Sequence, residues 1–312
     1  MLRSLYIALL VVAAVFSSCV RKDLKLENNI VDLTLSVDDG RGDGSIYRGL
    51  VWDLSTDAMK TTLFVRPGRS QATIPSGHSG FIVHTYGCES TYIAGDNAFG
   101  EVRATTNPAD AGTRDLWQSV LGAEAVLSPV ERERLATQDV RWEPDRMWAG
   151  LFEGVLPRRG QDESLEMEIV AEPLFSEHKA ILRNVEGMEY IASAEAFITG
   201  CAQARRVCDG SPVGTCVILV KAFRYEDGLL VSWTSFGESD SPLALKRLLL
   251  MVTDTGGRRF LASYDITDAF ADGDVMERAS GLVFERPPVT DAGGGLQPTL
   301  QDWDEVVTPV NI

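Results

Sequence analysis

Apolar and polar residues alternate with a period of two in separate segments of the chain. The alternation is strictest in two segments, Val31 to Val37 and Ser164 to Ala171, whose polar positions carry acids or hydroxyl residues. This period places successive side chains on opposite faces, so it is typical of a strand with one buried face. Glycine and proline separate the segments at intervals of about ten residues, which favours β-sandwiches over alternating strands and helices.

The pattern therefore predicts a mainly β protein with a few short helices. One helix is expected over Leu116–Gly122. Another is expected after Ser128, because serine is a preferred N-cap, Pro129 suits the first helical position and Glu131 places an acid in the first turn. The turn Asp254–Gly257 predicts a hairpin. The predicted strands lie at residues 31–37, 47–54, 61–65, 71–74, 80–86, 147–155, 164–171, 179–185, 190–198, 215–225, 229–236, 245–253, 259–265 and 304–312.

The first 18 residues are expected to be a lipoprotein signal peptide. An apolar run from Leu5 to Phe16 fits a signal-peptide core and is shorter than the about 20 residues of a transmembrane helix. Ser17 and Ser18 precede Cys19, and small residues before a cysteine are typical of the site that lipoprotein signal peptidase cuts. Several acyl chains, palmitate among them, would then give stable membrane anchoring through Cys19. The alternative is an ordinary secretory signal with an incidental cysteine.

The polar residues 19–29 predict a lipidated tether. Lys22 and Asp23 match part of a short charged tag for export to the outer face of the outer membrane, but no run of acids follows, so a plain spacer is an equal alternative. A second boundary is expected near Leu156–Gly160, where proline, arginine and glycine cluster. These features predict an N-terminal β-sandwich over residues 30–157 and a C-terminal one over residues 158–312.

Composition narrows the function classes. The 312 residues include 29 Lys and Arg against 45 Asp and Glu, giving a net charge of −16. Such an acidic chain is unsuited to nucleic acid, whose phosphates require a basic surface. Hydrophobic residues make up 45% of the chain, enough to build a core. No cofactor is expected.

Four cysteines remain besides the lipidated one. Cys201 and Cys216 flank a turn and would be cross-strand neighbours able to form a disulfide, which leaves Cys208 near Cys88 or free. Buried free thiols are an equal alternative. The intervals of six and seven residues between the last three cysteines do not fit the short Cys-x-x-Cys spacing of zinc sites.

Catalytic motifs are not found in the sequence. Ser76–Gly80 fails as a nucleophile elbow because Phe81 stands where the motif needs glycine. His84 lies in a predicted strand and is expected to be structural, whereas His178 is expected in a loop. The acidic loop at Asp38–Asp43 lacks the spacing of a calcium-binding EF-hand. No catalytic and no metal-binding residue is therefore predicted.

The six tryptophans could either pack in the core or form a platform that binds a sugar. Four of them lie in or near predicted strands and are expected in the core. They are Trp52, Trp142, Trp148 and Trp233.

The C-terminal segment from Gly293 carries three glycines, then Asp302-Trp303, then an apolar strand that ends at Ile312. Together with the lipidation site, Thr73–Gly77 and Glu189–Gly200, it resembles the fimbrillin-associated lipoproteins of Bacteroidetes, the FimB and Mfa-like anchor and accessory subunits. The resemblance implies two tandem transthyretin-like (Greek-key) β-sandwiches, no catalysis, and a cell-surface location at the outer membrane.

The same resemblance implies fimbrial subunits as partners, bound by strand addition, in which one subunit completes another's sheet. The residues expected to form the partner strand are Val306, Val307, Val310 and Ile312. Two rival functions stay open: a glycan-binding outer-membrane lipoprotein of a polysaccharide-uptake system, and a hydrolase with a pair of carboxylates in a cleft.

Overall fold

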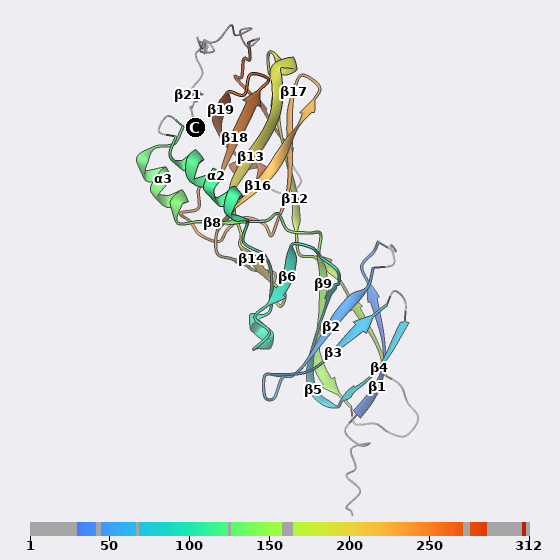
Figure 1. Cartoon of the computed structure of the whole chain (residues 1–312). Coiled ribbons are helices and arrows are strands. Elements are labelled where there is room, and N and C mark those ends of the chain that lie inside the picture. Colours follow the sequence, from blue (N-terminus) through green and yellow to red (C-terminus); the bar gives the residue numbers. More distant parts are fainter. Residues whose placement is uncertain are drawn as a thin grey trace, which may run out of the picture.

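The computed structural model describes residues 30–41, 45–66, 69–123, 126–157, 165–270, 275–285 and 308–309. The chain is mainly β and forms two bodies joined by a small sheet (Figure 1). Within the described part of the chain, no helix has both the length and the apolar character needed to cross a bilayer. The predicted signal peptide, Cys19 and the tether lie outside the described residues, as do Val306, Val307, Val310 and Ile312.

The N-terminal body packs a three-stranded sheet on a five-stranded sheet. In the first sheet, β1 (Ile30–Asp38) lies between β4 (Arg69–Pro75) and β10 (Leu165–Val170). The strands of the second sheet are, in spatial order, β11 (Glu172–Pro173), β9 (Trp148–Leu156), β5 (Gly77–Thr85), β2 (Tyr47–Asp53) and β3 (Ala58–Val65).

Strand β1 is fixed on both edges and on its inner face. It runs antiparallel to β4 and parallel to β10, so that Leu35 lies opposite both Ser70 and Met167. Val31, Leu33 and Leu35 are only 3%, 1% and 0% exposed, as their alternation with polar residues predicts. The strand that follows the predicted tether is thus part of the core.

The C-terminal body is built on one nine-stranded sheet. Strand β8 (Asp139–Arg141) pairs with β16 beside the main path. The remaining strands are, in spatial order, β20 (Val275–Ala279), β12 (Ser176–Arg183), β17 (Gly228–Ser235), β16 (Cys216–Tyr225), β13 (Ile191–Cys201), β18 (Arg247–Asp254), β19 (Arg259–Asp265) and β21 (Thr308–Pro309).

Both faces of the central strand β13 are buried. Ala196 and Ile198 face the inner core, and Phe197 faces α2 (Ala111–Leu121) and α3 (Pro129–Ala136), where its ring centroid lies 5.0 Å from that of Trp117. Helix α2 starts earlier than expected because Asp110 caps it, accepting a hydrogen bond of 2.7 Å from Thr113 N. The predicted cap of α3 is confirmed as a capping box.

A four-stranded sheet joins the two bodies, with two strands from each part of the sequence (Figure 1). It carries on its inner side an apolar cluster, the joining cluster, which includes Trp52 and Ile82 from the N-terminal sheet and Ala202 and Phe236 from the C-terminal half. The strands are, in spatial order, β15 (Pro212–Val213), β14 (Ala204–Arg206), β7 (Arg103–Thr106) and β6 (Thr91–Ala94), and short 3-10 helices lie at η2 (Phe99–Glu101), η3 (Met188–Tyr190) and η4 (Thr267–Phe270).

Strand pairing departs from the predicted division at residue 157. Strand β10 follows that boundary, yet it pairs with β1 in the N-terminal body. Helices α2 and α3 and strand β8 precede the boundary, yet they pack on the C-terminal sheet. Alternation identifies a strand but not its partner, and a parallel pair requires a long crossover that the local pattern does not reveal.

Candidate functional site

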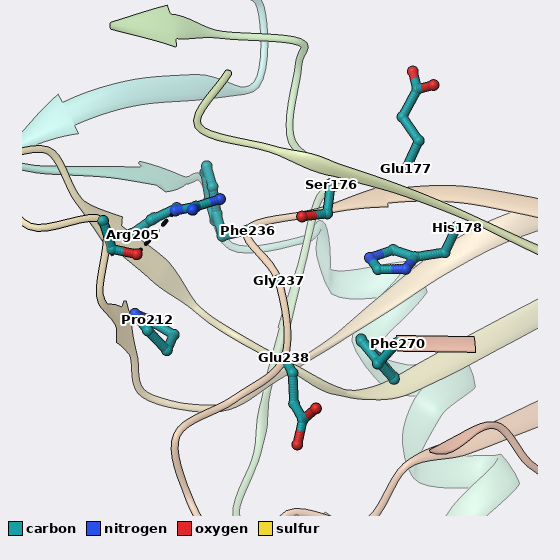
Figure 2. A pocket seen from close by; sticks show the side chains of 10 residues that line it. Ser176, Glu177, His178, Arg205, Pro212, Phe236, Gly237, Glu238 and Phe270 are labelled. Atoms are coloured by element: carbon teal, nitrogen blue, oxygen red, sulfur yellow. Dashed lines mark hydrogen bonds between the residues drawn. The ribbon is translucent and has the colours of Figure 1, made fainter. Parts of the chain in front are cut away.

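A cleft of about 240 Å³ lies where the joining sheet meets the C-terminal sheet (Figure 2). Strand β12 contributes Ser176, Glu177 and His178 to its walls, and the segment after β17 contributes Phe236, Gly237 and Glu238. The lining is completed by Arg205 on β14, Gly210 in the turn that follows, Pro212 on β15 and Phe270 of η4.

His178 forms the inner wall of the cleft and is fixed by two hydrogen bonds. Its Nδ1 lies 2.9 Å from the carbonyl of Ala269, and its Nε2 lies 2.9 Å from Ser235 Oγ. Burial lowers the pKa of His178, so the ring is neutral near pH 7 and has a single N–H. A carbonyl only accepts, so Nδ1–H donates to Ala269, and Nε2 accepts from the Ser235 hydroxyl. The ring also stacks on Trp233, with centroids 5.2 Å apart.

The Ser235–His178 contact holds three elements together. Ser235 is 1% exposed, and its Oγ also accepts a hydrogen bond of 3.0 Å from Gly237 N. The second nitrogen of His178 bonds a backbone carbonyl, where a catalytic triad would have a carboxylate. The contact therefore ties β12 to β17 and to η4. The expectation that His178 lies in a loop is wrong, because the residue is part of β12.

Arg205 is the cation of the cleft. Its Nε donates a hydrogen bond of 3.0 Å to the carbonyl of Gly210, which fixes the side chain within its own turn. The two acids of the lining have other partners: Glu177 pairs with Arg146 at 2.5 Å, and Glu238 pairs with Lys246. In Figure 2 both carboxylates point away from Arg205.

A second hollow of about 370 Å³ lies nearby on the C-terminal body. Its charged side chains are already engaged: Lys246 pairs with Glu238, Arg247 pairs with Glu131, and Asp265 accepts from the backbone and side chain of Thr267. The Arg205 cleft is therefore the better candidate for a ligand.

Two acids in the segment between β8 and β9 bond to the joining sheet and to the C-terminal sheet. Asp145 Oδ2 accepts hydrogen bonds from the backbone nitrogens of Ser90 and Thr91, at 2.7 and 2.8 Å. Glu143 Oε1 accepts one of 2.6 Å from Thr234 N on β17. Burial raises the pKa of Glu143, because it disfavours the charged form.

Replacing Glu143 with glutamine should leave the protein at least as stable as the wild type at pH 7. The amide oxygen still accepts from Thr234 N, and the cost of burying a charge is removed. Leucine at this position should instead lower the free energy of unfolding by about 1–3 kcal/mol, because the Thr234 N–H is left unsatisfied. Urea unfolding at pH 7 measures both. Equal destabilisation by the two variants would contradict the role given to this hydrogen bond.

His84 should make the protein less stable in mild acid. It lies in β5, as expected, and burial lowers its pKa from the usual 6.5 to about 4. The unfolded chain therefore binds a proton more readily, so stability is full above pH 6.5 and is lost as the pH falls towards 4. Between pH 7 and pH 5 the loss should be about 2 kcal/mol from this group. Urea unfolding at pH 7 and at pH 5 measures the free energy of unfolding. The difference between the two pH values should be smaller in His84→Gln than in the wild type; an equal difference would rule out His84 as the cause.

The remaining predicted site residues are placed as follows. Cys201 on β13 lies directly opposite Cys216 on β16, and both side chains are buried. None of the four cysteines in the described part of the chain is bonded to another cysteine in this structure, and burial raises the pKa of the Cys216 thiol to about 12. A disulfide between Cys201 and Cys216 stays a prediction. No group of three or more metal-ligating side chains is found among the described residues.

Two of the four tryptophan predictions hold fully. Trp52 and Trp233 are 0% and 1% exposed, and Trp148 is half-buried beneath the guanidinium of Arg41, 3.7 Å from its ring centroid. The prediction for Trp142 is wrong, because this side chain is 37% exposed beside β8.

Arg205 was not predicted as a site residue. The one signal of it in the sequence is that Arg205 and Arg206 form a basic pair in an acidic chain.

Comparisons with known proteins identify a solved structure that has the same fold. The sequence matches no family model, and no curated protein is significantly similar to it. The structure is similar to that of a provisionally assigned adhesin from Bacteroides ovatus, with a TM-score of 0.61, 17% identity, and coverage of 86% of this chain and 94% of that one. A more distant similarity is to the fimbrial anchor protein Mfa2 from Porphyromonas gingivalis, with a TM-score of 0.46, 8% identity, and coverage of 77% and 83%. The first similarity shows that the two proteins share a fold.

Proposed function

We propose that this protein is a cell-surface lipoprotein that anchors or accompanies fimbriae in adhesion, without catalysing a reaction. The proposal is carried by the fold that the chain shares with the Bacteroides ovatus protein over 86% of its length. The lipidation signal at Cys19 and the resemblance of the C-terminal segment to fimbrillin-associated lipoproteins add support from the sequence. The outer membrane, with the body exposed at the cell surface, is the location that follows.

The position of β1 suits an anchor. Cys19 would precede Ile30, the first residue of β1, by 11 residues, a span of at most about 40 Å. Because β1 is bonded on both edges, a load on the lipid would reach the sandwich core through many hydrogen bonds at once. A protein with this arrangement can hold a filament at the membrane without a transmembrane segment.

The C-terminal end suits a partner strand. Thr308 and Pro309 form β21 on the outer edge of β19, opposite Leu261 and Phe260. Proline has no N–H and is tolerated on such an edge. We assign the two bodies to transthyretin-like sandwiches, and the segment around β21 to strand addition with a fimbrial subunit. Its apolar residues are Val306, Val307, Val310 and Ile312.

Truncation after Gly295 tests the fimbrial role. The variant should retain its lipid but lose co-purification with fimbrial subunits from cells that express both. A matched variant, Val275→Thr, changes an exposed strand residue of the same body and should keep the partner. Undiminished co-purification of the truncated chain would overturn the proposed role of this segment.

A further inference from the structure

We propose that the Arg205 cleft binds a single carboxylated sugar, a hexuronic acid residue at the end of a glycan. This inference goes beyond the fimbrial role and does not depend on it. The carboxylate would bind to the guanidinium of Arg205, and the ring would lie against the apolar part of the mixed lining, Phe270 and Pro212.

The first support is unneutralised positive charge. Arg205 lies on β14 and lines the cleft. Among the described residues, no carboxylate lies within ion-pairing distance of its side chain. Arg206, the next residue on the strand, points to the opposite face of the sheet and does not line the cleft. In a protein of net charge −16, an arginine that lines a cleft without an acidic partner indicates a site for an anion.

The second support is the pre-set geometry of Arg205. Its Nε is bonded to Gly210 O, so the two terminal nitrogens are left to form a forked pair of hydrogen bonds. Carboxylates fit such a fork in a bidentate manner. A doubly charged phosphate fits less well, because Glu177 and Glu238 also line the cleft.

The third support is the mixed lining. Phe270 and Pro212 supply apolar surface, against which the C–H face of a pyranose ring can pack, whereas Phe236 is 3% exposed and offers little contact. The Ser176 hydroxyl has no hydrogen-bond partner in the described part of the chain, and Figure 2 shows it on the same side of β12 as Arg205 and Phe236. It can donate to or accept from a ring hydroxyl.

The size of the cleft sets the size of the ligand. Its volume of about 240 Å³ is below the range of about 300–1,000 Å³ that is typical of pockets for drug-sized ligands. One sugar ring with its carboxylate is therefore the largest unit that the cleft can enclose. A polysaccharide would be recognised through a terminal residue, with the rest of the chain in solvent.

Titration calorimetry on the detergent-solubilised full-length protein tests the proposal. Methyl glucuronoside and methyl galacturonoside should bind, whereas methyl glucoside and acetate should each bind at least about tenfold more weakly. Equal binding of the neutral glucoside would overturn the role of the carboxylate. Equal binding of acetate would overturn the role of the ring. A second arm compares a trisaccharide ending in glucuronate with the monomer: similar affinities support terminal recognition, and no binding of the trisaccharide contradicts it.

Variants locate the site. Arg205→Gln should weaken uronoside binding by about tenfold to a hundredfold, and Arg205→Lys should also weaken it, because lysine lacks the planar fork. The matched control, Arg206→Gln, removes the same charge one residue away and should change the affinity by less than about threefold. Thermal unfolding identifies any variant that fails to fold. If the Arg205 variants do not fold, Ser176→Ala provides the test, because it leaves the hydrogen bond between Arg205 and Gly210 intact. Unchanged affinity in a folded Arg205→Lys or Ser176→Ala protein would overturn the assignment.

Discussion

Replacing Leu35 with alanine should lower the free energy of unfolding by about 2–5 kcal/mol. Leu35 is completely buried at the centre of β1, between Ser70 on β4 and Met167 on β10. Alanine leaves a cavity that the flanking strands, bonded on both edges, can fill only in part. Aspartate would place an unpaired charge there and should prevent the N-terminal body from folding.

The control for this prediction is Thr34→Ala, which changes the neighbouring, half-exposed side chain on the opposite face of β1. It should alter stability by no more than about 0.5–1 kcal/mol. Urea unfolding monitored by tryptophan fluorescence measures both variants. A small effect of Leu35→Ala would mean that β1 contributes little to the core, and the proposed route of load from the lipid to the sandwich would have to be abandoned.

Replacing Trp52 with alanine should lower stability by about 3–5 kcal/mol and should uncouple the two bodies. Trp52 is fully buried in the joining cluster, where its ring meets Phe99 edge-on at a centroid distance of 5.5 Å. Ala202 and Phe236 of the C-terminal half belong to the same cluster. Loss of the Trp52 ring therefore removes contacts in the cluster to which the N-terminal sheet, the joining sheet and the C-terminal body all contribute.

Differential scanning calorimetry checks this second prediction. The wild type should unfold in one transition that involves both bodies, and Trp52→Ala should show two separated transitions. Trp142→Ala is the matched control, because this tryptophan is 37% exposed and should shift the midpoint only slightly. A single transition in Trp52→Ala, at the wild-type temperature, would contradict the coupling role of the joining cluster.

The strands that bury one face could be predicted directly from the alternation of apolar and polar residues. The alternation at residues 31–37 corresponds to β1, and that at residues 164–171 corresponds to β10. The same pattern did not reveal that these two strands pair in parallel, since pairing depends on contacts far apart in sequence. The division predicted at residue 157 therefore lies before β10.

The joining sheet was missed for a different reason. Strands β6, β7 and β14 have only three or four residues each, too few to establish a period. They are held by tertiary contacts instead. Gly95 follows β6 with φ of +77°, and a side chain there would collide with the carbonyl of Glu101.

The cleft could not be predicted because its residues come from distant parts of the chain. His178 and Arg205 are 27 positions apart, and Phe270 follows much later in a 3-10 helix. None of them belongs to a motif of fixed spacing. By contrast, the predicted lipidation site rests on a local signal of consecutive residues, which can be read directly from the sequence.

Metabolic labelling with a radioactive fatty acid tests the central claim, that this protein is held at the cell surface by lipid on Cys19. In cells that express the protein, the wild type should carry the label, sediment with the outer membrane and be accessible to added protease. Cys19→Ser should lose the label and the membrane association together, while its folded body is retained. Equal membrane association of an unlabelled Cys19→Ser chain, or an unlabelled wild type, would contradict the account.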